Sequence, residues 1–154
     1  MKASPSFQSM TIEEISKDNV SDLAQLVLYL WPECNYKEEF QNGLKILKSK
    51  NETAFIAKNH GIYLGFIQLS LRHEYVEGTS SSPVLYMEGI YVDPSHRKEG
   101  IAKKLVEKAQ LWGKTNGCTE MASDSFISNK NSIDFHQSVG FEEVSRLVTF
   151  KKKI

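Results

Sequence analysis

The spacing of apolar residues along the chain changes from a helical period to an alternating one and back. Between residues 18 and 30 apolar side chains recur every three or four positions, which predicts a helix capped by Asp18 or Asn19. The same period predicts further helices over residues 37–48, 100–115 and 129–138. Alternating or continuous apolar runs predict strands over residues 7–15, 53–58, 63–72, 84–92, 118–123 and 141–151.

This order of elements predicts an α+β fold. Helices segregated along a mixed, mostly antiparallel central sheet, with residues 100–115 as a crossover helix, form a layered sandwich. The chain has 154 residues, the size of one ordinary domain, and no repeat or low-complexity linker divides it. We therefore expect a single domain over residues 1–154, in which about four helices flank the central sheet.

Composition excludes some classes of function and favours others. The formal net charge is zero, which leaves no electrostatic footprint for nucleic-acid binding. We find neither an apolar run of the length of a membrane span nor a signal peptide, so a cytoplasmic protein is expected. Cys34 and Cys118 lie far apart without metal-ligand spacing, and we interpret them as reduced thiols. No metal site is predicted.

A short basic loop with one glycine joins the strand over 84–92 to the helix over 100–115. Backbone N–H groups from Lys98 to Lys103 would converge at the start of that helix, where a pyrophosphate can bind. Gly100 allows the backbone to approach a ligand closely. The alternative is a surface turn that only begins the helix, and for one glycine by itself that alternative is favoured.

The strand over 84–92 contains an interruption, Glu88-Gly89. A glutamate in an otherwise buried run must lie at an edge or line a cavity, and a glycine in a strand often marks a β-bulge. Unpaired N–H groups at a bulge could hold a linear ligand or polarise a carbonyl. A solvent-facing Glu88 on a half-exposed strand is an equally good interpretation.

Two later segments supply further candidate residues. Asp124 follows the strand over 118–123, and with Glu88 it could bind a polyamine and remove a proton from an ammonium group. The alternative for Asp124 is an ordinary turn or cap. The segment from Asn129 to His136 has the pattern of a capped amphipathic helix, in which a packed or hydrogen-bonded His136 is favoured over a catalytic one.

Together these residues resemble the GCN5-related N-acetyltransferase (GNAT) superfamily, over nearly the whole chain. The resemblance rests on the interrupted strand, on Arg97, Gly100 and Ala102 in an R-x-x-G-x-A loop, and on an N-x-x-S-x-x-x-H-x-x-x-G-F segment. At finer grain the chain is similar to the aminoglycoside 6'-N-acetyltransferases of type I. That similarity is carried by a series of short motifs in order: Leu30-Trp31-Pro32, Arg72-His73-Glu74-Tyr75-Val76, Ser81-Ser82-Pro83-Val84, Glu88-Gly89-Ile90, Trp112-Gly113, Gly117-Cys118, Glu120-Met121-Ala122-Ser123-Asp124 and Gly140-Phe141-Glu142-Glu143.

The resemblance implies a GNAT fold whose sheet is splayed between two central strands, and acetyl-CoA as cosubstrate in the gap. It implies an aminoglycoside as substrate, with Trp31 and Tyr75 flanking its rings and Glu88 and Asp124 holding its ammonium groups. Asp124 would act as the base in a direct transfer to the 6'-amine, which makes the drug ineffective, and Glu88 would assist. The implied contacts to the cosubstrate are Ile90, Tyr91, Val92, Arg97, Lys98, Glu99, Gly100, Ile101, Ala102, Lys103, Asn129 and His136.

Several questions stay open at the level of sequence. Many members of the superfamily have a tyrosine general acid where this chain has His136, so the general acid is unassigned. Other acceptors, a small polyamine or a protein amine, and a non-catalytic CoA-binding module are the alternative functions. The resemblance also implies a homodimer. The apolar run from Leu147 to Phe150 could contribute an interface, although a core strand is the favoured interpretation.

Overall fold

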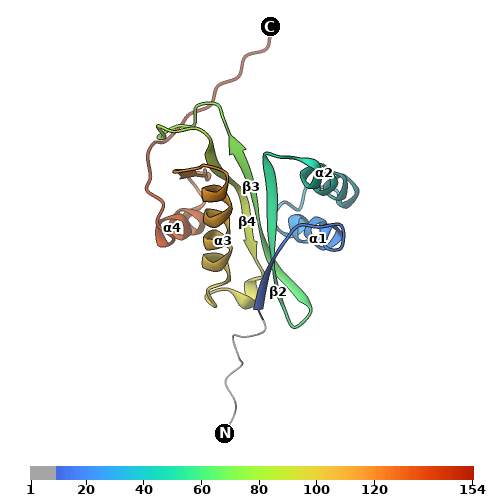
Figure 1. The fold of residues 1–154 in the computed structure, drawn as a ribbon. Helices are drawn as coiled ribbons and strands as arrows, with labels where there is room; N and C mark the ends of the chain where they lie inside the picture. The colour runs from blue at the N-terminus through green and yellow to red at the C-terminus, as the bar shows by residue number, and fades with distance from the viewer. Residues whose placement is uncertain (1–9) are drawn as a thin grey trace.

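The computed structural model describes residues 10–154, which form one mixed five-stranded sheet between two helical layers (Figure 1). The strand order is β1-β2-β3-β4-β5, antiparallel except for the parallel pair β4 and β5. This arrangement confirms the predicted α+β class. The elements are β1 Met10–Glu14, α1 Val20–Leu30, α2 Tyr36–Lys48, β2 Glu52–Asn59, β3 Ile62–Arg72, β4 Val84–Val92, the 3-10 helix η2 Pro94–His96, α3 Ile101–Thr115, β5 Met121–Ala122 and α4 Lys130–Ser138.

Each face of the sheet buries its own apolar cluster because side chains alternate along the strands. Helices α1 and α2 cover one face, where Leu23, Ile56 and Phe66 are buried. Helix α3 covers the other face, where Leu69 and Leu105 are fully buried, and α4 lies beside α3 (Figure 1). The apolar positions that predicted the helices are therefore the positions that face the sheet.

The predicted bulge in β4 is present. Met87 pairs with Leu69 and Gly89 pairs with Gln68, so Glu88 has no partner residue on β3. One extra residue on β4 shifts the register at this point. Because the bulge lies in the middle of the sheet, the sequence interruption marks a local distortion and not the end of the strand.

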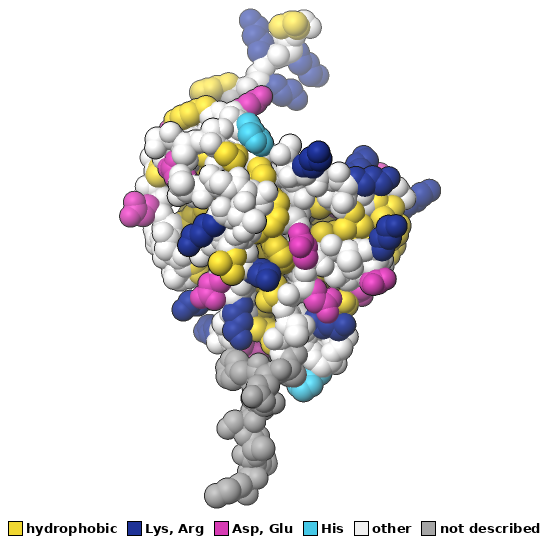
Figure 2. Space-filling view, viewed as in Figure 1, with side chains coloured by type: hydrophobic (Ala, Val, Ile, Leu, Met, Phe, Trp, Pro, Cys, Tyr) yellow, Lys and Arg dark blue, Asp and Glu magenta, His cyan; other side chains and the backbone are white. Residues whose placement is uncertain are grey.

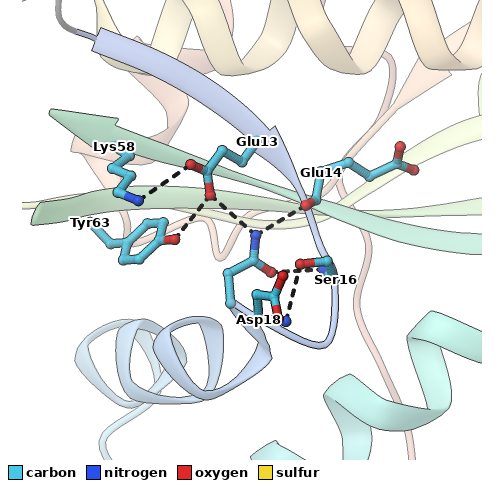
Figure 3. Close-up of polar contacts among 7 residues, drawn as sticks. Glu13, Glu14, Ser16, Asp18, Lys58 and Tyr63 are labelled. Atoms are coloured by element: carbon cyan, nitrogen blue, oxygen red, sulfur yellow. Dashed lines mark hydrogen bonds and ion pairs between the residues drawn. The ribbon is translucent and has the colours of Figure 1, made fainter. Parts of the chain in front are cut away.

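A polar cluster fixes β1 against the rest of the sheet (Figure 3). Glu13 accepts hydrogen bonds from the Tyr63 hydroxyl at 2.9 Å and from Asn19 Nδ2 at 3.3 Å, and lies 3.5 Å from Lys58 Nζ. Asn19, predicted as a possible helix cap, does precede α1. Its side chain accepts from Ser16 N and donates to β1, and makes no cap hydrogen bond to the helix. The cluster thus joins β1, the following turn and the β2–β3 hairpin.

The structure corrects the prediction at the end of the chain. Residues 141–151, predicted as a strand, follow α4 without any strand pairing. The strand predicted over 118–123 is reduced to Met121–Ala122. Alternation in a sequence reports how side chains would face if a strand formed, but a strand also needs a neighbour to satisfy its backbone groups. Of the strand predicted over 7–15, residues 7–9 lie outside the described residues.

Among residues 10–154, no helix has the length and apolar character needed to cross a membrane.

Candidate active site

A line of polar side chains crosses one face of β3 and β4 at the bulge. Glu88 accepts hydrogen bonds from Ser70 Oγ at 2.6 Å and from Arg72 Nη2 at 2.9 and 3.1 Å. The Arg72 guanidinium carbon also lies 3.3 Å from the centre of the Tyr86 ring, a cation–π contact. The Glu88 side chain retains 31% of its exposure, so this carboxylate is paired yet still accessible.

The second predicted carboxylate, Asp124, joins the same line through Tyr86. The Tyr86 hydroxyl donates a hydrogen bond to Asp124 Oδ2. Burial, followed by the bond to Asp124, raises the pKa of Tyr86 well above its usual range, so its hydroxyl stays protonated as a donor. Asp124 is exposed, and Tyr86 occupies only one of its two carboxylate oxygens. The structure therefore connects Glu88 and Asp124 through Arg72 and Tyr86.

Trp31 lies directly over the bulge. A Cβ added to Gly89 would lie 2.6 Å from Trp31 Cη2 and 3.2 Å from Leu30 Cδ2, so the absent side chain makes room for the indole ring. Trp31 also borders a pocket of about 210 Å³ between α1, α2 and the sheet, together with Gln68 of β3. The predicted substrate residue Trp31 and the predicted carboxylate Glu88 are thus brought to adjacent positions.

Tyr75 lies on the long loop between β3 and β4, and 77% of its surface is exposed. It borders a second pocket, of about 250 Å³, with Arg72, His73 and Glu74. Because Arg72 also contacts Glu88, this pocket adjoins the carboxylate line. The loop itself is held by Glu120, which accepts hydrogen bonds from Ser80 N and Ser81 Oγ.

β4 and β5 separate immediately after they pair. Among the described residues, their pairing is confined to Leu85 with Met121 and Tyr86 with Ala122. The remainder of β4, which includes the predicted residues Ile90, Tyr91 and Val92, has strand pairing only toward β3. Alternate backbone groups of a strand point to its other edge, so this part of β4 presents hydrogen-bonding groups on the β5 side.

The loop from His96 to Ala102 lies where β4 leads into α3. Lys98 has a φ of 65° and Gly100 a φ of 80°, both in the left-handed region. That conformation is accessible to glycine without a steric penalty, which explains Gly100 at the N-cap of α3. The first N–H groups of a helix have no acceptor within the helix, so they are available to an anion. Arg97 folds back to donate from Nε to the Val92 carbonyl at 3.0 Å.

Asn129 and His136 lie on the other side of the splay, Asn129 at the N-cap of α4 and His136 within the helix. Asn129 caps the helix by accepting from Ser132 N at 3.1 Å, as the sequence pattern predicts. His136 Nδ1 lies 2.6 Å from the Ser132 carbonyl oxygen, and Nε2 lies 2.8 Å from Ser123 Oγ. Because a carbonyl only accepts, Nδ1 is the donor there. His136 is therefore a hydrogen-bonded side chain in this structure, as expected, and it faces the point where β4 and β5 part.

Three residues of the site were not singled out from the sequence as candidates: Ser70, Arg72 and Tyr86. The alternation of side chains between the two faces of β3 and β4 indicates that these residues share a face. Ser70 pairs with Tyr86, and residues two positions apart on a strand share a face, so Arg72 and Glu88 lie on that same face. Finding them required the register of β3 against β4, which the bulge changes.

Comparison with known proteins gives a consistent assignment. The sequence profile of the acetyltransferase (GNAT) family matches residues 12–141. An aminoglycoside N(6')-acetyltransferase type 1 of Salmonella enteritidis is 40% identical over 144 residues, which cover 94% of this chain and 99% of that protein. Another, of Acinetobacter haemolyticus, is 37% identical over 145 residues, with the same two coverages.

Solved structures agree with the sequence relatives. AAC(6')-Iy, in complex with the bisubstrate analogue CoA-S-monomethyl-acetylneamine, superposes with a TM-score of 0.90 at 39% identity, over 94% of this chain and 99% of that one. AAC(6')-Ih of Acinetobacter baumannii superposes with a TM-score of 0.89 at 37% identity, with the same coverages. On this evidence the chain belongs to the acetyltransferase (GNAT) family, among relatives that are aminoglycoside N(6')-acetyltransferases of type 1.

Proposed function

We propose that this protein transfers the acetyl group of acetyl-CoA to the 6'-amine of aminoglycoside antibiotics and so confers resistance to them. The observation that carries the proposal is the connection of Glu88 and Asp124 through Arg72 and Tyr86, beside the splay between β4 and β5. The relatives that cover nearly all of the chain support the choice of acceptor, because their names specify that amine.

The donor fits the segments that the sequence predicts for it. The pantetheine arm of CoA contains amide groups, which can pair with the open edge of β4 at Ile90–Val92 as a further strand would. Its pyrophosphate can accept hydrogen bonds from the backbone of Lys98–Lys103 at the start of α3. Asn129, at the N-cap of α4, and His136, within that helix, would close the opposite side. When bound, acetyl-CoA supplies the activated acyl thioester.

The acceptor is expected to be a small polycation. Glu88 and Asp124 offer two carboxylates on one line, and a second pocket at Tyr75 extends the surface toward the β3–β4 loop. Trp31 and Tyr75 present exposed or half-exposed aromatic surfaces on which sugar rings and ammonium groups can pack. A bis-cationic sugar satisfies these features better than a single lysine side chain does.

Asp124 is the better candidate of the two carboxylates for the base. Glu88 accepts from both Ser70 and Arg72, whereas Asp124 keeps one carboxylate oxygen free of the Tyr86 bond. Asp124 would take a proton from the 6'-ammonium group, directly or through a water, and release a neutral amine. Holding that amine beside the thioester makes the reaction effectively intramolecular.

The transfer that we propose is direct. The amine nitrogen forms a bond to the acyl carbon and gives up one proton, the carbon–sulfur bond breaks, and the thiolate of CoA leaves and takes up a proton to become the thiol. A backbone N–H at the β4 bulge would stabilise the oxyanion that forms in between. Neither thiol of the chain favours an acetyl-enzyme, because desolvation raises the pKa of Cys34 and of the buried Cys118 and keeps both protonated.

The proposal is tested by measuring release of the CoA thiol with kanamycin, with a 6'-hydroxy analogue, with spermidine and with a lysine peptide. We expect release with kanamycin alone. Asp124→Asn should lower kcat by about a hundredfold, the usual contribution of a general base. Asp134→Asn, an exposed aspartate paired with Lys130 on α4, serves as the matched control and should leave kcat unchanged.

Each contrary outcome has a definite meaning. Thiol release with spermidine or the peptide, and none with kanamycin, would replace the acceptor by another small polyamine or a protein amine. Tight CoA binding without release in any arm would point to a non-catalytic module. An acetylated cysteine trapped in a quenched reaction would overturn direct transfer.

As the working form we propose a homodimer, because the segment after α4 leaves the domain with apolar side chains exposed.

A further inference from the structure

Glu120 lies between two parts of the proposed acceptor site. It directly precedes β5, and Asp124, the proposed base, follows four residues later. Its backbone carbonyl accepts a hydrogen bond from Leu85 N at 3.1 Å, which adds to the short pairing of β5 with β4. Its half-buried side chain reaches the loop between β3 and β4, which carries Tyr75. Glu120 therefore connects the strand that leads to the base with the loop that carries an acceptor residue.

Residues 73–83, the loop between β3 and β4, are tied together by hydrogen bonds of their own. Thr79 Oγ1 donates to the Val76 carbonyl at 2.7 Å, and Ser82 Oγ donates to the His73 carbonyl at 3.0 Å. Because both partners of each bond belong to the loop, these bonds shape it without fixing it to the domain. The place of the loop on the domain depends on its contacts with other elements.

One anchor of this loop is apolar. Val76 is buried in a small cluster with Tyr86 of β4, against which Ala122 of β5 packs. Tyr86 is also the residue that donates a hydrogen bond to Asp124. Because Val76 follows Tyr75 directly, this cluster links the exposed aromatic side chain of the loop to the residue that orients the proposed base.

Another anchor is the Glu120 carboxylate. Its Oε1 accepts hydrogen bonds from Ser80 N at 2.9 Å and from Ser81 Oγ, across 40 and 39 residues of sequence. The bond from the Ser81 hydroxyl, followed by the bond from Ser80 N, lowers the pKa of Glu120, so the group is a carboxylate at neutral pH. Hydrogen bonds to an ionised acceptor are stronger than those between neutral groups. One carboxylate oxygen thus holds the tip of the loop against the start of β5.

The position of the loop matters because the molecule has no strong overall field for a polycation. The formal net charge is zero, and among the described side chains in Figure 2 acidic and basic groups are interspersed over the face in view. A broad acidic surface would attract a cationic acceptor in many orientations. Here binding depends instead on single groups such as Tyr75 and Asp124, and therefore on the distance between them.

We propose that Glu120 is a positioning residue of the acceptor site, which holds Tyr75 at a fixed place relative to Asp124. It acts through its bonds to Ser80 and Ser81 and not by contact with the acceptor. This role rests on the proposed function, since that function assigns Tyr75 and Asp124 to the acceptor. The anchoring of the loop is separate from the reaction and is measurable without any substrate.

The first test is hydrogen–deuterium exchange of residues 73–83 in the free protein. Glu120→Ala removes both bonds to the loop and keeps the backbone bond to Leu85, so we expect the Ser80 amide to exchange about tenfold faster than in the wild type. Glu120→Gln keeps an acceptor oxygen at the same place and should restore most of the protection. Glu107→Ala, on the exposed face of α3, is the matched control and should exchange as the wild type does. Unchanged exchange in Glu120→Ala would overturn the anchoring.

The second test is steady-state kinetics with kanamycin. Glu120→Ala should raise the KM for kanamycin about tenfold, with little change in kcat or in the KM for acetyl-CoA, because one bonded anchor of the acceptor loop is lost. A general loss of folded protein would lower the apparent kcat instead. Ser81→Ala should raise the same KM by less, and in the Glu120→Ala background it should have no further effect, since its acceptor is already gone.

Additive effects of Ser81→Ala and Glu120→Ala, or an equal rise in the KM for acetyl-CoA, would overturn the positioning role. Absence of turnover by the wild type would overturn the proposed function, and with it the part of Glu120 in binding the acceptor. In that case hydrogen exchange would still decide whether Glu120 holds the loop, so the two failures are distinguishable.

Discussion

At the scale of single residues, the two carboxylates of the site differ in how far their oxygens are already bonded to neighbouring side chains. Glu88 forms an ion pair with Arg72, and one carboxylate oxygen of Asp124 accepts a hydrogen bond from the Tyr86 hydroxyl. The two carboxylates are therefore not equivalent, although a sequence presents them alike. Gly89 contributes through the side chain that it lacks, because Trp31 fills that space.

Substituting Gly89 by alanine should impair binding of the acceptor. The new Cβ would lie 2.6 Å from the indole ring, so Trp31 must move from its place over the bulge. We expect the KM for kanamycin to rise about tenfold, equivalent to about 1.4 kcal/mol, while the KM for acetyl-CoA changes little. In a Trp31→Ala background the same substitution should have no further effect. An equal rise in both backgrounds would show that Gly89 acts on the strand and not on Trp31.

Substituting Tyr86 by phenylalanine removes the donor to Asp124 and keeps the ring on which Arg72 stacks. We expect kcat to fall by about tenfold, the cost of one hydrogen bond to a charged group, with little change in the KM for kanamycin. Tyr86→Leu also removes the ring and should in addition raise that KM, since Arg72 loses its support. Equal effects of the two variants in steady-state kinetics would contradict this separation of roles.

At the scale of elements, two distortions of regular structure generate the site. The bulge at Glu88 changes the register of β4 against β3, and the early end of β5 opens the edge of β4. Gly100 then starts α3 with a positive φ at the end of that open edge. The polar cluster around Glu13 acts on the opposite edge of the sheet, where it joins β1 to the β2–β3 hairpin.

Glu13→Gln tests this cluster through the pH dependence of stability. The bond from Tyr63, with help from Asn19 and Lys58, lowers the pKa of Glu13 in the folded state. Such a carboxyl stabilises the fold above its unfolded pKa, near 4.5, and that stabilisation is lost as the pH falls through the lower folded pKa. At pH 7 we expect the variant to be less stable in urea by roughly 0.5–1 kcal/mol, because Glu13 is partly exposed.

The difference in stability between wild type and Glu13→Gln should narrow as the pH falls below 4.5 and through the lowered pKa of Glu13, because the wild-type carboxyl then takes up its proton. Glu107→Gln, on the exposed face of α3, is the control and should follow the wild type at every pH. A stability difference between wild type and Glu13→Gln that stays constant down to about pH 3 would mean that the charge of Glu13 does not contribute to the stability of the fold.

At the scale of the whole molecule, the two helical layers and the sheet account for the domain, and residues 142–154, which follow α4, project beyond it with large apolar side chains exposed. In the proposed homodimer, a chain that buries these side chains against its partner gains stability by association. We therefore expect the unfolding temperature to rise with protein concentration. A tenfold increase corresponds to about 1.4 kcal/mol per dimer, or about 2 °C for a molecule of this size.

A double variant, Val148→Glu with Phe150→Glu, places charges on two of these exposed side chains. Its unfolding temperature should not depend on protein concentration, and it should be lower than that of the wild type. Differential scanning calorimetry over two decades of concentration checks both statements. A wild-type unfolding temperature that does not change over this range would contradict a stabilising role for residues 142–154 in the homodimer.

Local patterns in the sequence were sufficient for most of the fold. The four helices, the strands β2, β3 and β4, the Glu88-Gly89 bulge and the loop before α3 were all predicted close to their observed places. Each depends on spacing within one short segment, such as the helical period of α3 or the glycine at its start. For the same reason the sequence singled out Glu88 and Asp124, which interrupt or end apolar runs.

The tertiary structure alone decided which side chains meet. Arg72 reaches Glu88 across a pair of strands, and Tyr86 reaches Asp124 across another, at separations of 16 and 38 residues. It also decided that the predicted strand over 141–151 remains unpaired in a single chain. A period of two specifies how a strand would face, but pairing and register are properties of two segments, and no pattern within one segment contains them.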